Sequence, residues 1–67
     1  MKLLKSYNIF LHIHCNFSKE VSNNIFGDLS EHIYSKWEGN VILFLNRLDD
    51  YNKMKLLNWA EKDYLRK

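Results

Sequence analysis

The fold prediction starts from residues 5–16, which read KSYNIFLHIHCN. From residue 7 onward the side chains fall into two alternating sets. The first set contains Tyr7, Ile9, Leu11, Ile13 and Cys15, and the second contains Asn8, Phe10, His12, His14 and Asn16. A period of two over ten residues is typical of a half-buried β-strand. The sequence therefore predicts a strand whose first set faces the core.

A helix is expected next, over residues 18–38. Ser18 is a favoured N-cap residue, and Glu20 in the first turn suits the positive end of the helix dipole. The expected apolar face recurs at every fourth residue, namely Val21, Ile25, Leu29, Ile33 and Trp37. Gly27 predicts a kink, or a restart capped by Asp28, and Gly39 with Asn40 ends the helix.

Two further elements complete the predicted fold. The unbroken apolar run 41–45 predicts a second strand that is covered on both faces. Asp49 or Asp50 then caps a last helix over residues 51–65. Its apolar stripe contains Met54, Leu56, Leu57, Ala60 and Tyr64.

The predicted fold class is therefore α/β, as one small two-layer βαβα domain over residues 1–67. The first three elements form a βαβ unit with a right-handed crossover. Two strands are too few for an independently stable sheet, and unpaired strand edges invite pairing. We therefore expect the sheet to be completed by a second copy in a homodimer, or by a partner protein.

Composition narrows the class of protein. A chain of 67 residues is only marginally stable alone, and its single cysteine, Cys15, excludes an internal disulfide.

The free cysteine and the absence of a signal peptide favour the cytoplasm, and no apolar run is long enough to span a membrane. Eight Asn, eight Lys and no Pro indicate an A+T-rich genome, such as that of a low-GC bacterium, its phages or its plasmids.

Cofactor and metal chemistry find little support in the sequence. His12 and His14 share one face of the predicted strand, so a metal ion would need a third ligand from the helix. The candidates for that ligand are His32, Asp28 and Glu31. Cys15 lies on the opposite strand face and cannot pair with either histidine for nucleophilic catalysis. We predict no cofactor, no metal and no enzymatic activity.

Trp59 is the most informative candidate contact residue. It lies off the apolar stripe of the last helix, and tryptophan is a favoured interface anchor. The alternative is that the helix buries both sides, or that Trp59 packs on a lysine stem. The predicted partner-binding residues are Trp59, Lys55, Lys62, Tyr51, Phe10, His12 and His14.

The favoured function is a small interaction protein that binds a larger protein. With the A+T-rich composition, we expect an inhibitor encoded by a phage or mobile element that sterically blocks a host or defence protein, as anti-CRISPR proteins do. The alternative is a nucleic-acid-binding accessory protein. That alternative uses the aromatic residues Trp59 and Tyr51 with the cations Lys53, Lys55, Lys62, Arg66 and Lys67. The acids Asp49, Asp50, Glu61 and Asp63 interrupt this cationic set.

Overall fold

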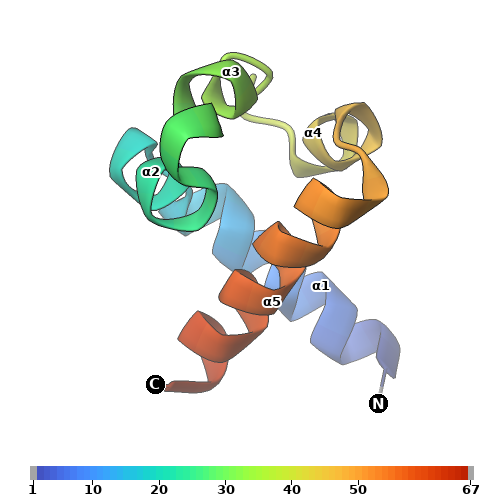
Figure 1. Ribbon diagram of the computed structural model, residues 1–67. Helices are drawn as coiled ribbons and strands as arrows, with labels where there is room; N and C mark the ends of the chain where they lie inside the picture. The colour runs from blue at the N-terminus through green and yellow to red at the C-terminus, as the bar shows by residue number, and fades with distance from the viewer. Residues whose placement is uncertain (1, 67) are drawn as a thin grey trace.

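The computed structural model describes the backbone of residues 2–66 and the side chains of residues 7–66. Over this range the chain forms helices joined by short turns (Figure 1). The elements are α1 (Lys2–Asn16), α2 (Lys19–Phe26), the 3-10 turn η1 (Gly27–Leu29), α3 (Ser30–Tyr34), α4 (Val41–Arg47) and α5 (Asp50–Arg66). Helices α1 and α5 cross each other, and α2, α3 and α4 lie above this crossing in Figure 1.

The predicted α/β class is wrong, because residues 2–66 contain no strand. No sheet therefore exists in the described residues for a second copy or a partner to complete. In α1 the buried apolar side chains are Ile9 and Ile13, and Phe17 follows with the same spacing of four. An alternating pattern also contains this helical spacing, and a helix satisfies its backbone groups without a neighbouring strand.

The strand prediction also placed the wrong side chains in the core. Tyr7 and Leu11 are exposed, and so is Cys15. His12, which the prediction placed on the polar face, is buried. These four residues show that α1 presents a different set of side chains to the core from the one that alternation predicts.

The second predicted strand is also a helix, α4. The Asn40 side chain accepts a hydrogen bond from the Leu43 backbone N–H at 3.0 Å, so Asn40 starts this helix and does not end the previous one. The buried residues have helical spacing and are Val41, Phe44, Leu45 and Leu48. A short apolar run carries no period of its own, which is why it was mistaken for a strand.

The helix expected over residues 18–38 is divided in the structure. The Ser18 hydroxyl accepts from the Val21 N–H at 3.2 Å, which confirms the predicted cap. Gly27 then ends α2, and α3 stops at Tyr34, well before Gly39. The buried Ser22 hydroxyl donates to the backbone carbonyl oxygen of Ser30 at 3.3 Å, so one side chain of α2 is bonded to the main chain of α3.

Replacing Gly27 by alanine is expected to lower the free energy of unfolding by about 1–2 kcal/mol. Gly27 has φ 56° and ψ −121°, a conformation that L side chains rarely adopt. No atom lies within 4 Å of the position that a new Cβ would take, so the cost is conformational and not steric. Urea denaturation measures it, with Asp28→Ala as the neighbouring control. Equal midpoints for the two variants would contradict the prediction.

Helix α5 completes the core. Asp49 accepts from the Asn52 N–H at 2.8 Å, which confirms Asp49 as the cap. Leu56 and Ala60 are buried, whereas Met54 is 57% exposed, contrary to its predicted place in the stripe. The core cluster contains Ile9, Ile13, Phe17, Phe26, Ile33, Val41, Phe44, Leu45, Leu48, Leu56 and Ala60. Within residues 2–66, no helix has both the length and the apolar character needed to cross a bilayer.

Candidate functional site

The structure divides the predicted contact residues of α5 between two places. Lys55 lies with its ammonium 5.4 Å from the ring centre of Tyr51 and 5.8 Å from that of Phe26. Tyr51 itself is 72% exposed. Trp59 and Lys62 lie one to two turns further along α5, beside the C-terminal end of α1. The expected basic and aromatic patch is therefore not one surface, and its last member, Lys67, lies outside the described residues.

The Trp59 side chain is not fully exposed on the polar side of α5. It is half-buried against the core, and its ring centre lies 5.6 Å from that of His12. Helix α5 packs on α1 and also on α2, so it buries more than the stripe that the sequence indicated. Of the interpretations of Trp59 offered by the sequence, the structure agrees with the one in which α5 is buried on both sides.

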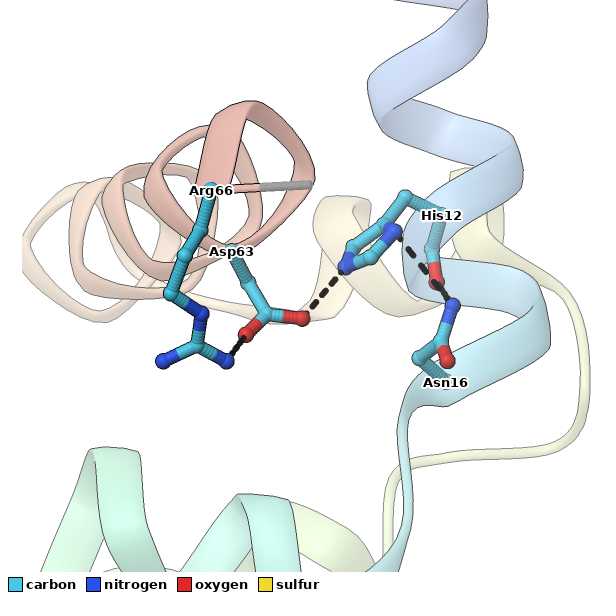
Figure 2. A network of polar contacts seen from close by, with 4 residues as sticks. All are labelled: His12, Asn16, Asp63 and Arg66. Atoms are coloured by element: carbon cyan, nitrogen blue, oxygen red, sulfur yellow. Dashed lines mark hydrogen bonds and ion pairs between the residues drawn. The ribbon is translucent and has the colours of Figure 1, made fainter.

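His12 is the centre of a polar network that joins α1 to α5 (Figure 2). Its Nε2 lies 2.8 Å from Oδ2 of Asp63, and Arg66 donates to the other carboxylate oxygen. The Asn16 amide donates to Nδ1 of His12 at 3.3 Å and to the His12 carbonyl oxygen at 2.9 Å. This geometry suits the tautomer with its proton on Nε2. Both ring nitrogens of His12 are therefore engaged by side chains of the protein.

His14 and Phe10 lie apart from this network. Residues two positions apart differ by about 200° around a helix, so His12 and His14 face different sides of α1. His14 is exposed, with its ring 6.3 Å from that of Trp37, and Phe10 is half-buried against the core. Among the side chains of residues 7–66, no three His, Cys, Asp or Glu groups are placed to hold a metal ion.

A pocket of about 480 Å³ lies beside the His12 network. It is formed by the end of α1, by α2 and by the last turns of α5. Its lining residues are Asn16, Val21, Asn24, Trp59, Lys62, Asp63 and Arg66. This volume is in the range of small-molecule sites, which is roughly 300–1,000 Å³. The lining combines one aromatic ring, one aliphatic side chain, two amides, two cations and one carboxylate.

A second concavity is an apolar groove of about 380 Å³ between α1 and the start of α4, called here the α1–α4 groove. It is lined by Tyr7, Phe10, Leu11, His14, Gly39, Asn40, Val41 and Ile42. Tyr7 is 60% exposed, Leu11 43% and Ile42 52%. None of the lining residues is Asp, Glu, Lys or Arg. Contiguous exposed apolar side chains of this kind mark interaction surfaces.

The sequence reasoning missed this groove because it assigned Tyr7, Leu11 and Ile42 to the core. A helical reading of residues 7–17 contains the missing signal. Tyr7, Leu11 and His14 fall on one face, separate from the face of Ile9 and Ile13. The core covers the face of Ile9 and Ile13, whereas Tyr7 and Leu11 on the other face stay exposed.

Helices α2 and α3, joined through Gly27, have the connectivity of a helix-turn-helix unit. The charge of the exposed face opposes duplex binding, because it carries Glu20, Asp28 and Glu31 against Lys19. Lys19 is already paired with Glu31 at 2.7 Å. The hydrogen bond and the charge of that carboxylate raise the pKa of the Lys19 ammonium above its ordinary value. This unit therefore offers phosphates no free cation from Lys19.

No protein-family model matches the chain, and the comparisons with curated proteins and with solved structures gave no match. The α1–α4 groove and the pocket beside His12 are the two surface features from which a function can be inferred.

Proposed function

We propose that the chain is a small, non-enzymatic protein-interaction module whose docking surface is the α1–α4 groove, and that the occupant of the groove is a second copy of the chain. The observation that carries the proposal is the exposure of Tyr7, Leu11 and Ile42 around one uncharged concavity. Water contact at these side chains is unfavourable, and burial against another apolar face removes it.

The uncharged lining favours a second copy as the occupant. In a symmetric pair the same patch meets itself, so any charge at its centre would face a like charge. The groove has no Asp, Glu, Lys or Arg among its lining residues, which include the aromatic side chains of Tyr7 and Phe10. Interface centres are typically depleted of charge and enriched in aromatic residues.

The size of the chain supports pairing as well. Domains of this length are commonly reinforced by disulfides, metals or association. Cys15 is the single cysteine of the sequence, and the side chains of residues 7–66 contain no cluster of three metal ligands. A standard interface buries about 800 Å² per partner, roughly a sixth of the 4833 Å² of accessible surface here. Association is thus the reinforcement that this chain can use.

Steric inhibition of a larger host protein, as expected from the sequence, belongs to the same class of activity. A pair joined through the α1–α4 groove would leave the exposed side chains of Tyr51 and Met54 on α5 available to such a partner. This inhibitory role is proposed from the sequence alone. The formation of a homodimer is therefore the first point to test.

Replacing Ile42 by aspartate is expected to weaken self-association at least tenfold, because two carboxylates would then meet in the interface. Sedimentation equilibrium over micromolar to millimolar concentrations measures it, with circular dichroism to check helix content. Met54→Asp is the matched control, because Met54 is similarly exposed and does not line the groove. A wild-type chain that stays monomeric throughout, or a dimer weakened equally by both substitutions, would overturn the proposal.

A further inference from the structure

We infer that the pocket beside His12 binds a nucleoside phosphate, either free or as one unit of a single strand. The pocket offers three kinds of contact that this ligand needs together. These are the aromatic side chain of Trp59, amides from Asn16 and Asn24, and positive charge from Lys62 and Arg66. The inference does not depend on pairing, because the pocket and the α1–α4 groove share no lining residue.

Trp59 supplies the surface for the planar base. Its ring contacts His12 on the core side and also lines the pocket. The contact with His12, which is itself held by Asp63 and Asn16, fixes the orientation of the indole. A stacked base on an aromatic side chain contributes about tenfold or more to affinity, and stacking tolerates any base.

Lys62 and Arg66 supply the charge for the phosphate. They are four residues apart, so they lie on the same side of α5 one turn from each other. One carboxylate oxygen of Asp63 accepts a hydrogen bond from Arg66, and the other accepts one from Nε2 of His12. Both oxygens of Asp63 are therefore already engaged. Figure 2 shows Asp63 on α5 between His12 of α1 and Arg66, whose side chain lies on the side of Asp63 away from His12. Two cations against one engaged carboxylate leave a net charge of +1 at the pocket.

The two amides supply hydrogen-bonding groups for the base edge or the sugar. Asn16 uses its N–H groups on His12, which leaves its carbonyl oxygen as an acceptor at the pocket. Asn24 is exposed on α2 and has both a donor and an acceptor. A purely apolar or purely cationic ligand would leave most of these groups without a contact, whereas a base joined to a phosphate can contact the aromatic ring, the amides and the cations together.

The experiment is a fluorescence titration of the full chain. Trp37 is first replaced by phenylalanine, so that Trp59 is the remaining tryptophan. The probes are uridine 5′-monophosphate, uridine, inorganic phosphate and a short oligouridylate, each added up to about 10 mM in monomer units. We expect the monophosphate to quench Trp59 and to bind about tenfold more tightly than uridine or phosphate alone.

A charge-reversal pair tests the site itself. Lys62→Glu is expected to weaken the monophosphate about tenfold or more, whereas Lys53→Glu on the same helix, which lies outside the pocket, leaves binding unchanged. Tighter binding of the oligouridylate, with an affinity that falls steeply with salt, would identify the single strand as the source of the ligand. Tighter binding of the free nucleotide would identify the small molecule.

Three results would overturn the inference. One is the absence of Trp59 quenching by both the monophosphate and the oligouridylate. The second is phosphate binding as tight as nucleotide binding, which would leave only an anion site. The third is an equal loss of affinity in Lys62→Glu and Lys53→Glu, because general attraction to the positively charged chain would then explain binding.

Discussion

Replacing Phe44 by alanine is expected to lower the free energy of unfolding by about 3–5 kcal/mol. Phe44 lies on α4 and is fully buried. Its ring centre lies 5.1 Å from that of Phe17, just after α1, and 5.3 Å from that of Trp37, just after α3. One side chain thus joins three segments that are distant in sequence. Removing it opens a cavity and also removes two aromatic contacts.

The expected loss is large relative to the total stability. A domain of 67 residues has a free energy of unfolding of about 3–10 kcal/mol, so Phe44→Ala is expected to leave a substantial fraction unfolded. Urea denaturation followed by circular dichroism measures it. Leu43→Ala is the control on the same helix, because Leu43 is 46% exposed and should change stability by about 1 kcal/mol or less. Similar urea midpoints for the two variants would show that the contacts of Phe44 with Phe17 and Trp37 do not stabilise the packing of α4.

The parts of the fold that depend on neighbouring residues could be predicted from the sequence. The caps at Ser18 and Asp49 are bonds to a backbone N–H three residues on. The last helix was also predicted, because its pattern is long and helical. Gly27 was identified as an interruption, since few other residues accept its backbone angles. In each case the cause and the result lie within one or two turns of the chain.

The class of the fold could not be predicted in this way, because residues 7–16 and 41–45 fit two periods. Alternation in the first segment contains the helical series of Ile9 and Ile13, and the second segment is apolar at every position. Contacts with distant parts of the chain decide whether these two segments form helices or strands. Ile13 and Phe44 are fully buried in one cluster although some thirty residues separate them. A strand in either place would also need a partner strand, and residues 2–66 contain none.

In the candidate site, too, the features set by neighbouring residues could be predicted, and those set by distant contacts could not. The sequence grouped Trp59 and Tyr51 with five cations because they share one helix, whereas of these residues the pocket is lined by Trp59, Lys62 and Arg66. The contact between His12 and Asp63 joins residues 51 positions apart, and no local pattern indicates it. The strand prediction placed His12 on the strand face that points away from the core, as a partner-binding residue. The pocket depends on this contact, because it brings the end of α1 against the last turns of α5.

Replacing Asp63 by alanine is therefore expected to destabilise the protein by about 2–3 kcal/mol. The substitution leaves the Nε2 proton of the buried His12 without its acceptor at a place that water reaches poorly. It also removes the partner of Arg66, but that loss is small because Arg66 is mostly exposed. Thermal or urea unfolding measures the change, and Arg66→Ala is the matched control, with an expected effect of about 0–1 kcal/mol.

A double substitution separates the hydrogen bond from simple loss of packing. In His12→Leu the buried donor is gone, so adding Asp63→Ala should cost less than it does in the wild-type chain. We expect the two changes to be non-additive by about 0.5–3 kcal/mol, as for groups in direct contact. Strictly additive effects would show that His12 and Asp63 stabilise the fold independently. In that event contacts other than the His12–Asp63 bond would fix the orientation of Trp59, which packs on the His12 ring.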